Sequence, residues 1–111
     1  VNLEYRKLGK LDVSVIGLGT LRTFDVTDEA NLAQRQQIID NLLSNDINFI
    51  DSATMYGASE KAVGTTIKGK RNRFYLATKV RIEGKKTGEQ QIAQSLRTSV
   101  WTTSTCSRCT I

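Results

Sequence analysis

The sequence predicts an α/β fold in which helices lie outside a parallel sheet. Short apolar runs typical of strands alternate with longer runs that have helical periodicity, and this alternation favours parallel strands joined through helices. Two short strand-like runs, residues 3–7 and 11–14, come first, and Gly9-Lys10 between them indicates a small hairpin. A length of 111 residues with 39% hydrophobic content allows one domain at most. The expected order is therefore a hairpin followed by βαβαβα.

The first strand after the hairpin is expected within residues 15–20 (VIGLGT), a buried-strand candidate that ends in a Gly-x-Gly turn. As a dinucleotide fingerprint, GxGxxG, the run is incomplete, because Arg22 stands where the third glycine belongs. We interpret the glycines as a turn that lets the chain leave a strand tightly, with the backbone near a ligand.

Residues 30–44 predict the first helix, for which Thr27, Asp28 and Glu29 supply the cap and the first-turn acids. Its apolar positions follow i, i+1, i+4, i+5 and form one buried stripe, made of Ile38, Ile39, Leu42 and Leu43. Asn45-Asp46 ends the helix, and residues 47–50 form the next expected strand.

Two further helices are expected. Ser59 is expected to cap the second, whose narrower apolar stripe consists of Ala62, Val63, Thr66 and Ile67. The basic run 68–73 (KGKRNR) then leads into a strand at residues 74–80. The third helix is expected to be capped by Thr87, with Gln90 at the capping-box position. Its inner face is expected to carry Ile92 and Leu96.

Charge is unevenly distributed. Residues 1–60 carry five Lys and Arg against nine Asp and Glu, whereas residues 61–111 carry eleven against two. A basic half suggests an anionic partner, nucleic acid included. No aromatic residues interleave with KGKRNR, so we interpret this run as a solvated connection between a helix and a strand. We expect no nucleic-acid partner.

Neither a membrane segment nor a metal site is predicted. No run approaches the ~18 apolar residues of a membrane span, and no signal peptide is visible, so we expect no membrane partner. Both cysteines lie near the C-terminus, so a disulfide framework is not expected and a cytoplasmic setting is. Cys106 and Cys109 form a single CxxC pair, which is a weak signal for zinc or redox chemistry without further ligands. The absence of histidine excludes Ser/His/Asp and Cys/His catalysis within the chain.

Chemically active side chains follow two consecutive predicted strands. Asp51 follows the strand at residues 47–50, Tyr56 comes five residues later, and Lys79 lies near the end of the next strand. Because the carboxyl ends of parallel strands share one edge of a sheet, we expect the three side chains on one face, where α/β folds usually place their chemistry.

The order GLGT, then NFIDSATMYG followed by SE, then a strand ending in ATKV resembles the aldo-keto reductase family. The pattern D-x-A-x-x-Y-x-x-x-E-x-x-x-G is filled by Asp51, Ala53, Tyr56, Glu60 and Gly64, within a resemblance that covers residues 3–97. It implies an N-terminal hairpin plus the first three βα units of a (β/α)8 TIM barrel, left incomplete. We interpret Glu60 and Gly64 as a first-turn acid and a close-packing glycine.

The resemblance also implies a reaction: NADPH-dependent reduction of aldehydes or ketones, or oxidation of the matching alcohols or sugars. Carried over, Tyr56 is the proton donor, Lys79 lies beside it and Asp51 pairs with Lys79. A free phenol titrates near ~10, and an adjacent ammonium favours the phenolate, so phenol, ammonium and carboxylate form one proton-handling unit. Cofactor contacts are implied for Gly19, Thr20 and Asp51, while the main NADP-binding segment of the family is expected to be absent.

Residues 98–111 (TSVWTTSTCSRCTI) depart from the family pattern, and eight of these fourteen residues are Ser or Thr. Codons can be chosen for these fourteen residues so that the same bases also encode a second peptide. With one G added in front and the reading frame shifted by one nucleotide, they read DFRMDYIDLLQVHN. That is the strand the family would have here, with its histidine at the end. We therefore hypothesise a partial reductase domain at residues 1–97 followed by an out-of-frame tail at residues 98–111.

A truncated barrel has physical consequences. We expect the third strand to be an unpaired edge, the chain to be marginally stable, and turnover to require complementation. Whether the chain is an enzyme therefore stays open beside three alternatives: a catalytically dead fragment, a regulatory subunit such as some relatives provide to potassium channels, and a nucleic-acid binder whose affinity falls steeply with salt. Neither the substrate, the choice of NADP over NAD, nor the oligomeric state is predicted.

Overall fold

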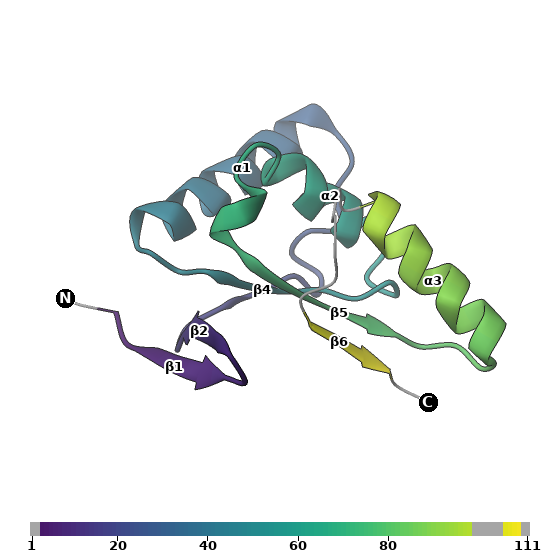
Figure 1. Ribbon diagram of the computed structural model, residues 1–111. Helices are drawn as coiled ribbons and strands as arrows, with labels where there is room; N and C mark the ends of the chain where they lie inside the picture. The colour runs from purple at the N-terminus through teal and green to yellow at the C-terminus, as the bar shows by residue number, and fades with distance from the viewer. Residues whose placement is uncertain (1–2, 99–105, 110–111) are drawn as a thin grey trace.

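The computed structural model describes residues 3–98 and 106–109. An antiparallel hairpin precedes a parallel sheet with the strand order β3-β4-β5-β6, and the helices α1, α2 and α3 lie on one side of this sheet (Figure 1). The strands are β1 Tyr5–Leu8, β2 Leu11–Ser14, β3 Leu18–Gly19, β4 Phe49–Asp51, β5 Tyr75–Val80 and β6 Cys106–Cys109. The helices are α1 Glu29–Ser44, α2 Ser59–Thr66 and α3 Lys85–Thr98. The predicted α/β class and the predicted hairpin are confirmed.

The hairpin packs against the N-terminal end of β4. Its strands pair from Tyr5 opposite Ser14 to Leu8 opposite Leu11, and Gly9 in the connecting turn has a φ of +63°, which glycine adopts without steric cost. Asn48, directly before β4, exchanges hydrogen bonds with Ser14: the Ser14 N–H donates to Asn48 Oδ1 at 2.9 Å, and the Asn48 N–H donates to Ser14 Oγ at 3.1 Å. The opposite end of the sheet therefore stays free of the hairpin.

The strand β3 is shorter than the predicted run 15–20, because only Leu18 and Gly19 pair with β4. Gly17 lies so close to β4 that an added Cβ would be 2.9 Å from Phe49 Cδ1 and 3.2 Å from the Phe49 carbonyl oxygen. Gly17 therefore lets this segment lie close to β4, because a larger residue there would crowd the ring and the carbonyl of Phe49.

Helix α1 begins and ends as its sequence predicts. Asp28 is the N-cap, and its carboxylate accepts the N–H of Asn31 at 3.1 Å. After the last turn, Asp46 has a φ of 57°, and Ile47 donates its N–H to the Leu42 carbonyl at 2.9 Å. This left-handed residue and back-bond form a Schellman ending, which directs the chain from the helix into β4.

One apolar core fills the space between the helices and the sheet. The apolar stripes predicted for the first two helices both face it, so these predictions are confirmed. A fully buried side chain of this kind contributes about 1.5–3 kcal/mol, so α1 and α2 are held mainly by apolar packing. The core consists of Phe24, Ile39, Leu42, Ile50, Ala62, Val63, Ile67, Phe74 and Leu76.

The start of α2 differs from its prediction. Ser59 is the first residue of the helix, and the cap position belongs to Ala58, which has no side chain that can accept a hydrogen bond. The Asp25 carboxylate accepts the Ala58 N–H at 2.8 Å instead. A residue far away in the sequence therefore caps this helix, which a local pattern does not reveal.

Helix α3 also starts earlier than predicted. It begins at Lys85, so Thr87 lies in its first turn and donates its hydroxyl to the carbonyls of Glu83 and Gly84. Leu96 is half-buried against the core, as expected, but Ile92 is 37% exposed and the prediction that it faces inward is wrong. Helix α3 therefore buries fewer apolar side chains in the core than α1 or α2 does.

The prediction that the third strand is an unpaired edge is wrong. In the structure β6 pairs in parallel with β5, from Ala77 opposite Cys106 to Val80 opposite Cys109. Backbone hydrogen bonds form between extended segments largely without regard to their side chains, so this tail segment satisfies groups that β5 would otherwise leave open. The rest of the predicted Ser/Thr-rich tail lies outside the described residues, apart from Thr98 at the end of α3.

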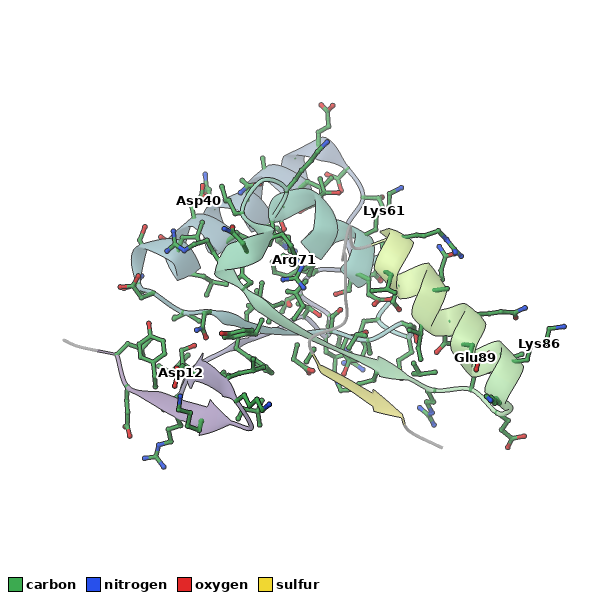
Figure 2. The ribbon with its side chains drawn as sticks, in the orientation of Figure 1. Asp12, Asp40, Lys61, Arg71, Lys86 and Glu89 are labelled. Atoms are coloured by element: carbon green, nitrogen blue, oxygen red, sulfur yellow. The ribbon has the colours of Figure 1, made fainter. Side chains whose placement is uncertain are left out.

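The basic run forms a connection between α2 and β5, as interpreted from the sequence, and includes a 3-10 turn at Arg71–Arg73. Lys70 Nζ lies 3.0 Å from Asp40 of α1, and Arg73 lies 3.9 Å from Asp46. Two cations of the run thus contact acids of this chain. Figure 2 shows Asp40 and Lys61 extending from the outer surface of the helices. None of the described helices is long and apolar enough to cross a membrane.

Candidate active site

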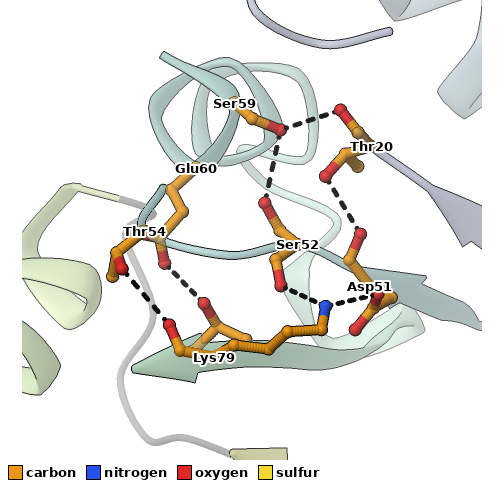
Figure 3. Close-up of polar contacts among 8 residues, drawn as sticks. Thr20, Asp51, Ser52, Thr54, Ser59, Glu60 and Lys79 are labelled. Carbon is orange, nitrogen blue, oxygen red and sulfur yellow. Dashed lines mark hydrogen bonds and ion pairs between the residues drawn. The ribbon is translucent and has the colours of Figure 1, made fainter. Parts of the chain in front are cut away.

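Lys79 and Asp51 meet at the C-terminal end of the sheet. Lys79 Nζ donates to Asp51 Oδ2 at 2.7 Å and to the carbonyl oxygen of Ser52 at 3.0 Å (Figure 3). The Lys79 side chain is only 17% exposed, against 40% for Asp51. A charge-assisted bond that is shielded from water on the lysine side holds the ammonium in one place.

Tyr56 lies over this ammonium. Its ring centroid is 5.1 Å from Lys79 Nζ, within the range of a cation–π contact, and the side chain is half-buried. The loop between β4 and α2 turns at this residue, because the Tyr56 N–H donates to the Ala53 carbonyl at 3.2 Å and the Ser59 N–H donates to the Tyr56 carbonyl at 3.1 Å. The structure therefore brings together Asp51, Tyr56 and Lys79.

Gly19, the last residue of β3, pairs with Asp51 of β4, and Thr20 directly follows the strand; the two residues differ in exposure. Gly19 is exposed, and an added Cβ would meet no atom within 4 Å, so its backbone borders open space. Thr20 is fully buried, and both its N–H and its hydroxyl donate to the Asp51 carbonyl, at 3.1 and 3.0 Å. Thr20 thus holds the backbone of Asp51 in place through the Asp51 carbonyl oxygen.

Comparison with known proteins assigns the chain to a family. Residues 15–105 match the sequence pattern of the Aldo/keto reductase family, a range that includes residues 98–105. The chain belongs to the aldo-keto reductase family. The matched range covers the sheet end described above, so Asp51, Tyr56 and Lys79 all fall within the aldo-keto reductase region.

Individual relatives agree with this assignment. The chain is 34% identical over 87 residues to the aldo-keto reductase str7 of Strobilurus tenacellus, a match that covers 69% of this chain and 25% of that protein. The holo form of an aldo-keto reductase from Bacillus halodurans superposes with a TM-score of 0.79 at 28% identity, over 96% of this chain and 40% of that one. An aldo-keto reductase from Klebsiella pneumoniae in complex with NADPH gives a TM-score of 0.71 at 30% identity, over 80% of this chain and 32% of that one. The chain spans less than half the length of each of these aldo-keto reductases.

A hydrogen bond from Ala58 to Asp25 joins the Tyr56 loop of this aldo-keto reductase chain to the segment after β3. Gly57 has a φ of +61°, and a Cβ there would lie 2.4 Å from Asp25 Oδ1, the oxygen that accepts the Ala58 N–H. Only glycine therefore allows the carboxylate so close to the loop. The sequence analysis did not single out Gly57, and the sequence contains no local signal for its partner, Asp25.

Three buried hydroxyl residues support the same loop from below. Ser59 Oγ lies 3.3 Å from Ser52 Oγ and 3.3 Å from the Thr20 carbonyl oxygen, and all three residues are fully buried (Figure 3). Because Ser52 also supplies the carbonyl that accepts from Lys79, these bonds connect the loop with the ammonium. Sequence reasoning interpreted Ser59 as a cap and did not single out Ser52.

Glu60 is a buried carboxyl at the first turn of α2, only 7% exposed. Its two oxygens accept separately, from Thr78 Oγ1 at 2.9 Å and from Ser95 Oγ at 3.0 Å. Burial raises the pKa of Glu60, and the two hydroxyl donors oppose this rise. The sequence identified Glu60 as a first-turn acid, which it is, but did not predict its burial or its partners.

Proposed function

We propose that this chain carries the proton-handling part of the active site of an NADPH-dependent reductase that acts on aldehydes or ketones, or in reverse on the matching alcohols or sugars. The observation that supports this most directly is the position of Lys79 Nζ, 2.7 Å from Asp51 Oδ2 and 5.1 Å from the Tyr56 ring centroid. Membership of the aldo-keto reductase family supports the reaction class, and the relative from Klebsiella pneumoniae was solved with NADPH.

Each of the three side chains has a role in this proposal. Tyr56 donates a proton from its hydroxyl to the oxygen of the carbonyl group as that oxygen gains negative charge. Lys79 stabilises the phenolate that remains through its opposite charge, since its Nζ lies 5.1 Å from the centroid of the Tyr56 ring. Asp51 and the Ser52 carbonyl hold Lys79 Nζ from two sides, which keeps the ammonium aimed at the ring. When bound, NADPH supplies the hydride.

The residues at the edge of the sheet fit a cofactor at this position. We propose Gly19, Thr20 and Asp51 as the contribution of this chain to NADPH binding. The open space at Gly19 lets a ligand approach the backbone closely, and Thr20 keeps Asp51 in place through two bonds to its carbonyl. Since the chain matches 32% of the NADPH-bound relative, we infer that most other cofactor contacts come from segments that this chain does not contain.

We also propose that the reductase domain comprises residues 1–97 and that residues 98–111 are read out of frame. Support comes from β6, which lies in the parallel position beside β5. In the shifted reading its four positions carry L, L, Q and V in place of CSRC, and apolar runs are typical of strands in parallel sheets. Sequencing genome and transcript independently, from codon 95 through the bases after codon 111, tests the idea. Bases that do not encode this strand in the shifted frame would refute it.

The catalytic assignment is tested by restoring a complete barrel. Residues 1–97 are joined to the part of the Bacillus halodurans reductase that supplies the remaining strands and helices of the barrel. Aldehyde reduction is then measured as the loss of NADPH absorbance. Tyr56→Phe is expected to lower kcat by about 10²–10⁴-fold, the usual contribution of general acid catalysis, while NADPH still binds. Tyr75→Phe, at the other end of β5, is the matched control and is expected to leave kcat unchanged. A Tyr56→Phe protein with undiminished turnover would contradict the assignment.

A further inference from the structure

Helix α3 reaches the candidate site through polar side chains that lie one turn apart. Gln91 and Ser95, at i and i+4, share one face of the helix. Ser95 is almost fully buried, at 1% exposure, and its hydroxyl donates to Glu60 at 3.0 Å. The apolar contribution of the helix is modest, since Ile92 is exposed and Leu96 only half-buried. The position of α3 is therefore set largely by directional hydrogen bonds.

Glu60 connects the two segments that carry the proposed catalytic residues. It lies four residues after Tyr56, on the helix that the Tyr56 loop enters, and its second oxygen accepts from Thr78 at 2.9 Å. Thr78 is the residue directly before Lys79 on β5. One buried carboxyl thus joins α2, β5 and, through Ser95, α3.

Gln91 makes a second connection between the same two segments. Its side-chain oxygen accepts from the Thr54 hydroxyl at 3.0 Å and from the Arg81 N–H at 3.1 Å. Thr54 lies two residues before Tyr56, and Arg81 two residues after Lys79. Thr54 also donates its N–H to the Lys79 carbonyl, at 3.4 Å. Gln91 therefore joins a residue just before Tyr56 to a residue just after Lys79. Glu60, which itself follows Tyr56, bonds to the residue just before Lys79.

We propose that Glu60 and Gln91 are positioning residues, through which α3 sets the distance between the Tyr56 ring and the Lys79 ammonium. Hydrogen bonds fix distances and directions, which apolar packing alone does not, so this arrangement suits a site that depends on one ammonium-to-ring distance. The catalytic meaning of this inference rests on the proposed function. The geometry that it concerns is measurable without cofactor or turnover.

The ring current of Tyr56 provides the measurement. In the 111-residue chain labelled with ¹³C-lysine, the ε-methylene resonances of Lys79 are assigned as those that disappear in Lys79→Arg. The difference between their chemical shifts in the parent chain and in Tyr56→Leu is the displacement caused by the ring. Glu60→Ala and Gln91→Ala are each expected to lose most of this displacement. Glu60→Gln is expected to retain it, because an amide still bonds two hydroxyls. The matched controls are Glu83→Ala and Gln90→Ala, at exposed positions of the same region.

Each outcome decides the question. Folded Glu60→Ala and Gln91→Ala proteins with an undiminished displacement would show that α3 has a structural role only, and would overturn the inference. If Glu60→Ala does not fold, Thr78→Val and Ser95→Ala each remove one bond to Glu60 and take its place. If Tyr56→Leu leaves the Lys79 resonances unmoved, the pairing of ring and ammonium fails, and with it both the proposed function and this inference. In the completed barrel, Glu60→Ala is expected to lower kcat and leave NADPH affinity unchanged.

Discussion

Glu60 is expected to make the stability of this chain fall as the pH rises, opposite to the usual effect of a carboxylate in an ion pair. Burial raises the pKa of Glu60 in the folded chain, while the hydroxyls of Thr78 and Ser95 oppose that rise. The folded state therefore holds the proton more tightly than the unfolded state does. The contribution of Glu60 to the free energy of unfolding is complete below its pKa in the unfolded chain, about 4.3, and is lost as the pH rises through its pKa in the folded chain.

Glu60→Gln isolates this effect, because the amide keeps the shape of the side chain and does not titrate. Between the two pKa values, the free energy of unfolding of the parent chain falls by up to about 1.4 kcal/mol per pH unit from this group. The stability of Glu60→Gln relative to the parent should therefore grow over this interval and then level off. For a domain of this size each kcal/mol shifts Tm by about 4–8 °C, so the change is measurable.

Urea unfolding followed by circular dichroism, at a series of pH values from about 4 upward, measures the difference in unfolding free energy. Other carboxyls titrate in the same range, but they are common to both proteins and cancel in the comparison. Glu83→Gln makes the same chemical change at an exposed position and is the matched control for the substitution itself. A Glu60→Gln difference that stays flat or shrinks as the pH rises would refute the reasoning that burial dominates at Glu60.

Two further substitutions test the fold and the Tyr56 loop. Leu76→Ala, in the fully buried centre of β5, is expected to lower the free energy of unfolding by about 2–5 kcal/mol, whereas Leu8→Ala on the exposed hairpin should change it by about 0.5 kcal/mol or less. Equal urea midpoints for the two would contradict the core described here. Gly57→Ala adds backbone strain of about 1–3 kcal/mol and a clash with the Asp25 carboxylate, while Gly9→Ala adds the strain alone, so thermal unfolding should rank Gly57→Ala as the less stable.

Local patterns were enough to predict most elements of the fold. The stripe at Ile39 and Leu42, the cap at Asp28 and the break at Asp46 each depend on residues within a few positions of one another, and all three appear in the structure. The caps assigned to Ser59 and Thr87 were wrong for a related reason: each hydroxyl had another partner nearby or across the fold, and a local pattern does not rank such competitors.

The candidate site divides in a similar way. That Asp51, Tyr56 and Lys79 lie close together follows from parallel strands that end at one edge, so the sequence could predict it. What supports these residues could not be predicted. Glu60 bonds to Ser95, 35 positions away, and Asp25 accepts the N–H of Ala58, 33 positions away. No periodicity or motif links positions at such separations.

The amino-acid sequence by itself determined the class of fold, the order of its elements and the residue types that meet at the end of the sheet. These properties depend on short-range periodicity and on the fixed geometry of parallel strands. Only the tertiary structure decided that Glu60 is buried with a raised pKa, that Gln91 joins the ends of two segments, and that β6 pairs with β5. Burial and long-range hydrogen bonds depend on which surfaces meet when the chain packs, and that is a property of the whole fold.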